Sequence, residues 1–393
     1  MKVLMVNNMG TLHGGAETMI ARLRNSLENK GHNVRILAGN ERGDGERIAD
    51  ATFLSFDGDS TFLRIMYLFN PFAILAVRYE LETFKPDIVH LHLVSKASPF
   101  ILPLFKDYPT VLTMHDHTYF DPTRIKDIPE MDSCGKTLSD YFIHKPSLRL
   151  YMEKIRFFFL RRFARYVDLV FTCSDFYGVC AAKSGIFREI KTLHNGIRLP
   201  DPVPVEDKKE ILFVGRLSEE KGVLVLIEAI ARLRSKHPDL RLKIAGSGHL
   251  QGKIEDLIRE KDIVDMVEIL GFKPYEEVIG LYRSSSLVAV PSIYPDNLPT
   301  VCIEAMGVGR AVIASKIGGI PELIDEDKTG ILVEPSDAEA LAEGIDRLFS
   351  DFSLLRKMGE EGRKKAERCF SESEYYKKTL ATYEDLNKRY KKI

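Results

Sequence analysis

Short apolar runs alternate with longer helix-like stretches along almost the whole chain, and this alternation limits the folds that the chain can adopt. In the first half, the apolar runs lie at 2–6, 32–38, 52–56, 87–92, 109–114, 168–173 and 190–194. Helical stretches separate them, notably at 61–84 and 140–165. Strands that alternate with helices usually form a parallel sheet covered on both faces. The pattern therefore predicts an α/β fold.

The alternation breaks once, at 198–209, where three prolines and several charged residues suggest a linker. It then resumes with apolar runs at 210–215, 240–245, 266–270 and 286–290, and the chain is helical and charged after residue 332. We expect a first domain over 1–200, a second over 201–370, and a C-terminal helix over 371–393 that packs back toward the first. Two such halves should leave a ligand cleft between them.

Composition excludes several classes of protein. The 393 residues include 56 basic and 57 acidic residues, so the near-neutral charge gives no reason to expect a nucleic-acid partner. The opening apolar run, MKVLMVNN, is too short for the core of a signal peptide, and no run approaches the roughly 20 residues of a membrane span. The five cysteines are scattered and form no CxxC pair, and Cys173, Cys180 and Cys302 lie in apolar contexts that suggest buried free thiols. We expect a cytoplasmic protein, with peripheral contact at the inner face of a membrane as an open possibility.

The stretch at 291–322 has the features of a ligand site. It follows an apolar strand and begins with a polar loop that carries Asp296 and Asn297. Pro299 suits the first turn of a helix that contains Glu304, and the buried strand AVIAS follows. Loops at the carboxyl ends of parallel strands bind ligands, and the start of a helix favours an anion. Two carboxylates beside an anion site suggest a ligand with both phosphate and sugar hydroxyls.

A second candidate site lies where the alternation resumes, in the sequence ILFVGRLSEEKGV. Arg216 follows the strand, and Lys221 stands five residues later at an expected helix start. Two cations beside helix N–H groups can neutralise a diphosphate leaving group without a metal. A solvated basic loop, with Glu219 and Glu220 as local partners, is the alternative explanation.

Together these motifs resemble glycosyltransferase family 4. The chain contains GRLSEEKG, and about 75 residues later DNLPTVCIEAMGVGRAVIAS and GGIPEL. MKVLMVNN…GGAE, KPDIVHLH, TMHD, HNGI and DKTGILV also occur in the order typical of the family. The resemblance covers most of the chain. It implies a GT-B-like architecture of two facing Rossmann-like domains, retention of anomeric configuration, and a UDP- or GDP-sugar as donor, with no essential cofactor or metal.

The resemblance also assigns roles to individual residues. Arg216 and Lys221 match the pair that binds the donor diphosphate. Glu304 matches the second glutamate of the E-x7-E motif, which usually binds the nucleotide ribose, and Asp296 stands at the position of the first, which contacts the donor sugar. In the first domain, His115 matches a family histidine that lies near the donor sugar and its reacting carbon. Gly14 and Gly15 match the family's glycine turn, which faces the donor phosphates.

This chain departs from the family pattern at the first carboxylate. Asp296 is one methylene shorter than glutamate, and Asn297-Leu298-Pro299 replaces a glycine-rich loop. Because Pro299 has no N–H to donate, a phosphate cradle would use the N–H groups of Leu298, Thr300 and Val301. We therefore expect donor-sugar specificity to differ from that of relatives at Asp296. Gly318 and Gly319 permit positive φ and suggest a wall of the nucleotide site.

Four histidines leave a metal site open as an alternative. His90 and His92 share one strand, and His115 and His117 follow another, so four rings could converge on zinc. Only His115 has a family match, and satisfied core histidines are the simpler explanation. Asp57-Gly58-Asp59 resembles a metal-binding DxD motif, but an ordinary turn explains it better.

Two further segments could contact other molecules. The stretch 149–165 interleaves six basic residues with phenylalanines, which would suit an anionic membrane surface as well as a core helix with solvated arginines. We favour the core helix, because a buried strand follows. The long loop 118–139 is expected to cover the acceptor side.

The sequence thus predicts a retaining glycosyltransferase that uses a nucleotide-sugar donor and a glycan, lipid-linked or small-molecule acceptor. The acceptor should enter near Gly14, His92 and Asp116. Three alternatives stay open: a sugar-nucleotide epimerase or hydrolase of the same architecture, a non-catalytic nucleotide-sugar-binding protein, and a zinc hydrolase.

Overall fold

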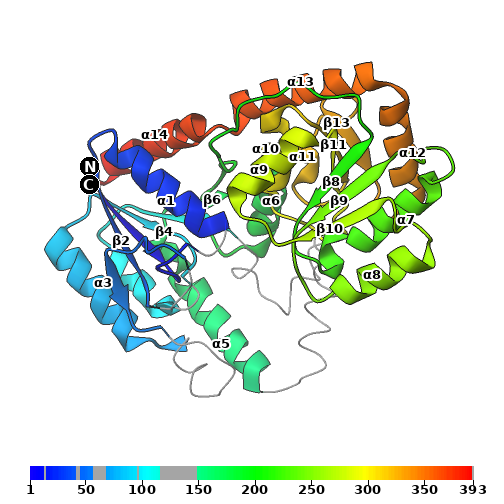
Figure 1. Ribbon diagram of the computed structural model, residues 1–393. Coiled ribbons are helices and arrows are strands. Elements are labelled where there is room, and N and C mark those ends of the chain that lie inside the picture. Colours follow the sequence, from blue (N-terminus) through cyan, green and yellow to red (C-terminus); the bar gives the residue numbers. More distant parts are fainter. Residues whose placement is uncertain (13–14, 41–44, 56–67, 95–96, 116–147, 392–393) are drawn as a thin grey trace. The chain divides into compact units, whose positions relative to one another are not determined.

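The computed structural model describes residues 1–12, 15–40, 45–55, 68–94, 97–115 and 148–391, and these residues form two compact units (Figure 1). The first unit comprises Met1–Asn195 together with Tyr375–Ile393, and the second comprises Gly196–Glu374. Both units are α/β.

The first unit contains a parallel sheet whose described strands run in the order β3-β2-β1-β4-β5-β6-β7. Its elements are β1 (Lys2–Asn7), α1 (Gly15–Glu28), β2 (Asn33–Gly39), β3 (Ala51–Phe53), α3 (Pro71–Phe84), β4 (Ile88–Leu91), η2 (Pro99–Phe105), β5 (Thr110–Met114), α5 (Leu148–Phe163), η6 (Ala164–Tyr166), β6 (Leu169–Thr172), α6 (Asp175–Ser184) and β7 (Ile190–Thr192). The central strands β1, β4, β5 and β6 are almost wholly buried, as strands covered on both faces should be.

The last helix of the chain, α14 (Glu372–Tyr390), belongs to the first unit from Tyr375 onward. Its residues Thr379, Tyr383 and Leu386 are buried. The Tyr390 hydroxyl donates to the Asp168 carboxylate at 3.0 Å, and Arg389 forms a 3.0 Å ion pair with Glu189. Both partners lie far away in the sequence, so α14 joins this unit through its buried face and through polar contacts.

The second unit contains a parallel sheet of order β10-β9-β8-β11-β12-β13. Its elements are β8 (Glu210–Val214), η7 (Glu219–Lys221), α7 (Val223–Leu233), β9 (Arg241–Ala245), α8 (Gln251–Glu260), β10 (Val267–Gly271), α9 (Tyr275–Ser284), β11 (Leu287–Val290), α10 (Thr300–Val308), β12 (Ala311–Ser315), α11 (Ile320–Leu323), β13 (Gly330–Val333), α12 (Ala338–Ser350) and α13 (Phe352–Cys369). Helix α7 packs against α8 and α12, and α10 packs against α9 and α13, so helices cover the sheet on two faces (Figure 1).

The proline-rich stretch that suggests a linker is held against the second unit. Val203 donates its N–H to the Val308 carbonyl at 3.2 Å, and Arg363 donates to the Pro200 carbonyl. Arg310 is fully buried, and its guanidinium donates to the carbonyls of Val203 (2.6 Å), Arg283 (2.6 Å) and Tyr282 (2.9 Å). A buried guanidinium needs acceptors for its donors, and here main-chain carbonyls supply them. The stretch is therefore a bound strap and does not swing freely.

One other expectation from the sequence is confirmed. Cys173, Cys180 and Cys302 are buried free thiols. Within the described residues, no helix is both long enough and apolar enough to cross a bilayer. Cys134, the loop 118–139 and Asp57–Asp59 lie outside the described residues.

Candidate functional site

The second sheet reverses its strand order between β8 and β11, and two of the predicted residues meet there. The loop after β8 leads to Lys221, and the loop after β11 carries Asp296. Lys221 Nζ donates to Asp296 Oδ1 at 2.6 Å, and the Ser292 hydroxyl donates to Asp296 Oδ2 at 2.7 Å. Both partners of the ion pair are largely shielded, with 26% and 19% of their side chains exposed. A ligand crevice is expected at such a switch point, because the loops on either side diverge.

Glycines hold these two loops together. Gly222 has φ +65°, and a Cβ there would overlap the carbonyl oxygen of Pro291. The Ile293 N–H also donates to the Glu220 carbonyl at 3.0 Å. On the other side, Gly318 has φ +60°, and a Cβ would overlap the backbone of Asp296. The absence of side chains at Gly222 and Gly318 therefore permits the backbone contacts that fix Asp296 beside Lys221.

The break at Gly222 changes the expected helix start. The sequence predicts one helix from residue 221, but Glu219–Lys221 form a separate 3₁₀ turn and α7 begins at Val223. Gly222 adopts a left-handed conformation between them. Lys221 is therefore the last residue of the 3₁₀ turn and not the first residue of α7. From this position its side chain reaches Asp296 in the loop after β11.

Arg216 stands at the open side of this region. Its side chain is 71% exposed, and its only described ion pair is a 3.6 Å contact with Glu220. Exposed ion pairs contribute little to stability. The guanidinium can therefore turn toward an anion at small cost.

The helix start near Asn297 and Leu298 differs slightly from the prediction. Pro299 lies one residue before α10, which begins at Thr300, and no described side chain caps this end. The first N–H groups of a helix lack partners within the helix, so those of Thr300 and Val301 are suited to an anion. The side chain of Leu298 is buried, which anchors the loop.

Glu304 has a buried partner that the sequence did not suggest. The Tyr282 hydroxyl, from α9, donates to Glu304 Oε2 at 3.0 Å. Burial and the negative charge of Glu304 raise the pKa of Tyr282, so the phenol stays protonated and can donate. Cys302, fully buried nearby, also has a raised pKa because of burial and the charge of Asp296, which makes it an inert thiol.

A hollow of about 290 Å³ lies beside Arg216, at the carboxyl ends of β8, β9 and β10. Gly215 and Gly246 line it, together with Phe272 and Lys273. The Phe272 side chain is 76% exposed. An exposed aromatic ring at the rim of a hollow offers a flat face on which another ring can stack.

Tyr282, Ser292 and Phe272 are not among the residues predicted from the sequence. Ser292 precedes Asp296 by four residues within the same loop, so the spacing could have suggested it. Tyr282 and Phe272 lie in other elements and carry no local signal of a site. Their positions depend on how α9 and the end of β10 pack in the unit.

In the first unit, the switch point lies between β1 and β4. Gly15 begins α1 there, and Gly14 lies outside the described residues. Asn7, at the end of β1, donates to Glu17 of α1 at 3.3 Å and accepts from the N–H of Leu93 at 3.2 Å. These contacts tie the turn that contains Gly15 to the loop after β4.

The rings of His90, His92 and His115 lie in a row, and their nitrogen atoms form hydrogen bonds with neighbouring side chains. His90 Nδ1 lies 2.5 Å from the Tyr383 hydroxyl, and its Nε2 lies 2.7 Å from Thr113 Oγ1. His92 Nδ1 lies 3.0 Å from His115 Nε2. Burial, with His115 nearby, lowers the pKa of His90 to about 3, and burial likewise lowers that of His92. Both His90 nitrogens are thus occupied, as in a satisfied core histidine; His117 lies outside the described residues.

His92 is buried, with only 1% of it exposed, and its Nδ1 faces His115 Nε2. Entry of the acceptor near His92 stays a prediction. Asp116, the other residue expected near the acceptor, lies outside the described residues.

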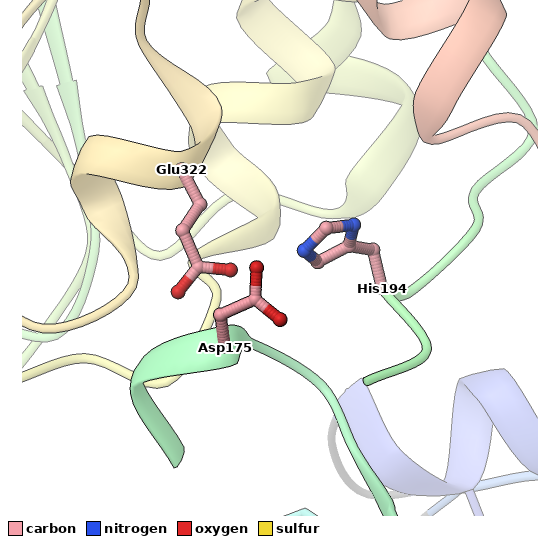
Figure 2. A group of neighbouring side chains, drawn as sticks. All are labelled: Asp175, His194 and Glu322. Carbon is pink, nitrogen blue, oxygen red and sulfur yellow. The ribbon is translucent and has the colours of Figure 1, made fainter. Parts of the chain in front are cut away.

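Figure 2 draws the polar side chains of Asp175, His194 and Glu322. Asp175 begins α6 and His194 follows β7, both in the first unit, while Glu322 belongs to α11 of the second (Figure 2). A carboxylate oxygen of Asp175 and a ring nitrogen of His194 lie within 4.8 Å of each other. Two ligands of one unit do not make a metal site.

Two family models match this chain. Residues 13–199 match the model "Glycosyltransferase Family 4", and residues 199–365 match "Glycosyl transferases group 1". An uncharacterized glycosyltransferase of Methanocaldococcus jannaschii is 34% identical over 178 residues, which is 45% of this chain and 45% of that protein. The chain thus spans about half the length of that relative.

Solved structures share the fold over nearly the whole chain. Sucrose-phosphate synthase from Thermosynechococcus elongatus has a TM-score of 0.73 at 20% identity and covers 98% of each chain. Anabaena HepE, in complex with UDP-glucose, has a TM-score of 0.70 at 18% identity and covers 98% of this chain and 99% of its own. At these identities the likeness establishes the fold, which is that of GT-B enzymes with two Rossmann-like domains.

Proposed function

This chain belongs to glycosyltransferase family 4, and on that premise we propose that it moves a sugar from a nucleotide diphosphate sugar to a glycan, lipid or small-molecule acceptor. The observation that carries the proposal is the Lys221–Asp296 pair at the switch point between β8 and β11. It places a shielded cation and a carboxylate side by side, as a ligand with both phosphate and hydroxyl groups requires.

The diphosphate is the part of the donor that develops charge during transfer. We assign it to Lys221, Arg216 and the leading N–H groups of α10. Lys221 would exchange its contact with Asp296 for a phosphate oxygen, and Arg216 would turn from Glu220. Preorganised cations of this kind stabilise a leaving group in the transition state, so no metal is needed for that role.

The nucleoside is assigned to the other side of the same region. Glu304, whose carboxylate is oriented by Tyr282, would accept hydrogen bonds from the ribose hydroxyls. The hollow beside Arg216 would take the base, with Phe272 stacking on it. HepE, which has a similar fold, binds UDP-glucose, and this supports a UDP-sugar as the first donor to test.

The sugar-facing residues follow the family resemblance. Asp296 would contact donor-sugar hydroxyls, and His115 with the turn at Gly14 and Gly15 would act on the donor from the first unit.

In the proposed step, the bond between the anomeric carbon and the diphosphate oxygen breaks and a bond to the acceptor oxygen forms on the same face. The acceptor proton passes to the departing diphosphate, which leaves as a nucleoside diphosphate.

A donor panel tests this function. UDP- and GDP-sugars are incubated with the protein, with and without lipid-linked and glycan acceptors, and nucleotide release and glycoside formation are both measured. The proposal expects glycoside only with an acceptor, with activity that persists in chelator. Turnover without an acceptor would instead indicate an epimerase or hydrolase, and binding without any product would indicate a sensor. Loss of activity in chelator would favour the metal hydrolase.

A further inference from the structure

One helix of the first unit presents an unusual exposed face. Along α5 and η6, the exposed side chains fall at helical spacing: Tyr151, Lys154, Phe158, Arg161, Arg162 and Arg165, hereafter the α5 stripe. Phe157, Leu160 and Ala164 lie on the opposite face and are buried. The expectation of a core helix is thus met by one face only, since the other carries four cations and two exposed rings.

The rings of the α5 stripe are open to water although they are large and apolar. Phe158 is 66% exposed and Tyr151 is 64% exposed. Among the side chains of the stripe that the structure describes, none is acidic. Transfer of the two rings from water into an apolar environment would be favourable. The cations beside them would attract an anionic partner.

A second helix of the first unit, α3, also exposes apolar side chains. On α3, Phe72, Leu75 and Tyr79 stand at positions i, i+3 and i+7 and are all exposed. Phe69, just before α3, is also exposed and packs edge-on against Phe100 of η2, with ring centroids 5.5 Å apart.

The two helices are linked through η2, on which both pack. The Phe100 ring also contacts Phe159 of α5, at 4.7 Å between centroids. The chain of rings from Phe69 through Phe100 to Phe159 therefore connects two helices that each expose apolar side chains.

We propose that the α5 stripe, together with the exposed side chains of α3, docks on the surface of a bilayer that contains anionic lipids. Lysine and arginine bind lipid phosphates while their stems lie along apolar surface, and aromatic rings insert at the level of the headgroups. An acidic protein would satisfy the cations, but apolar side chains exposed on both helices fit a hydrocarbon boundary better. The proposal is independent of the transfer reaction.

Vesicle binding tests the proposal without any measurement of activity. The full chain is sedimented with vesicles of phosphatidylcholine alone and with vesicles in which phosphatidylglycerol replaces part of it. We expect binding only to the second kind, weakened by salt. Each cation removed should lower the partition coefficient about fivefold, so Lys154, Arg161, Arg162 and Arg165 changed together to Gln should abolish binding.

A matched variant controls for net charge. Lys377, Lys378, Lys388 and Lys391 are also exposed cations of the first unit, and their change to Gln should leave binding intact. Phe158→Ser should weaken binding at every salt concentration, because it removes only apolar insertion. Thermal unfolding checks that each variant folds. The proposal is overturned by equal binding to neutral vesicles, by no binding at all, or by retained binding in the quadruple stripe variant; concentration-dependent dimerisation without vesicle binding would assign the face to a second copy.

Discussion

Lys221 Nζ and Asp296 Oδ1 lie 2.6 Å apart, although 75 residues separate them in the sequence. The pair joins the loops after β8 and β11, the two neighbouring strands between which the strand order of the second sheet reverses. In the proposed site, a donor phosphate takes the place of Asp296 as the partner of Lys221.

Lys221→Met should reduce kcat for transfer by roughly 10²- to 10³-fold, because it removes the cation nearest the leaving diphosphate. Lys243→Met is the matched control, since Lys243 forms a 2.7 Å ion pair with Glu210 in the same unit at similar exposure. Initial rates with saturating donor measure the effect. Near-full activity of Lys221→Met would refute the diphosphate assignment.

Asp296→Asn should tighten the binding of free nucleoside diphosphate by a few-fold, because the phosphate no longer competes with a carboxylate for Lys221. Transfer should nevertheless fall at least about tenfold, since the sugar loses a charged acceptor. Calorimetry with the nucleoside diphosphate, alongside rate measurements, distinguishes the two effects. Asp346→Asn, which breaks the 2.6 Å pair with Lys236, should change neither quantity.

Tyr282→Phe should raise KM for the donor by roughly tenfold with a smaller change in kcat. The variant removes the hydroxyl that orients the Glu304 carboxylate, and a hydrogen bond to a charged group contributes about 1.5–3 kcal/mol. Tyr390→Phe removes a similar hydroxyl from the Asp168 carboxylate in the first unit and should leave KM unchanged. An unaltered KM in Tyr282→Phe would show that Glu304 needs no such support.

Gly222→Ala should abolish donor binding. It should also lower the free energy of unfolding by more than the cost of placing alanine in a left-handed conformation. Alanine in a left-handed conformation costs about 1–2 kcal/mol, and at Gly222 its Cβ would also overlap the Pro291 carbonyl. Gly185→Ala isolates the first effect, because Gly185 has φ +63° and no atom within 4 Å of the added Cβ. Urea unfolding and nucleotide titration are measured for both variants. Equal losses of stability and of nucleotide affinity would mean that the close contact between Gly222 and the Pro291 carbonyl is unimportant.

Buried His90 should make the first unit acid-sensitive. Its pKa is lowered to about 3 in the folded chain, against about 6.5 when unfolded, so only the unfolded chain takes up a proton between these values. Stability due to His90 is complete above about pH 6.5 and falls by about 1.4 kcal/mol per pH unit below it. His90→Gln should show a correspondingly shallower decline in urea-unfolding experiments, whereas His249→Gln, at an exposed site, should match the parent.

Much of the fold could be predicted from local patterns. The apolar runs at 87–92 and 109–114 became β4 and β5, because strands buried on both faces need continuous apolar sequence. The helix start was displaced at Lys221, because the contact of Gly222 with Pro291 is not local. The burial of His92 could not be read from the sequence, because it depends on packing against neighbouring strands.

The sequence by itself determined the α/β class, the family and the types of side chain at the candidate site, since periodicity and motif spacing are local properties of the chain. Only the tertiary structure decided that Lys221 pairs with Asp296, that Tyr282 holds Glu304, and which face of α5 remains exposed. Those relationships depend on which strands become neighbours and on which helix faces their packing covers. Sequence spacing does not encode either directly, because both are decided by contacts between residues far apart in the chain.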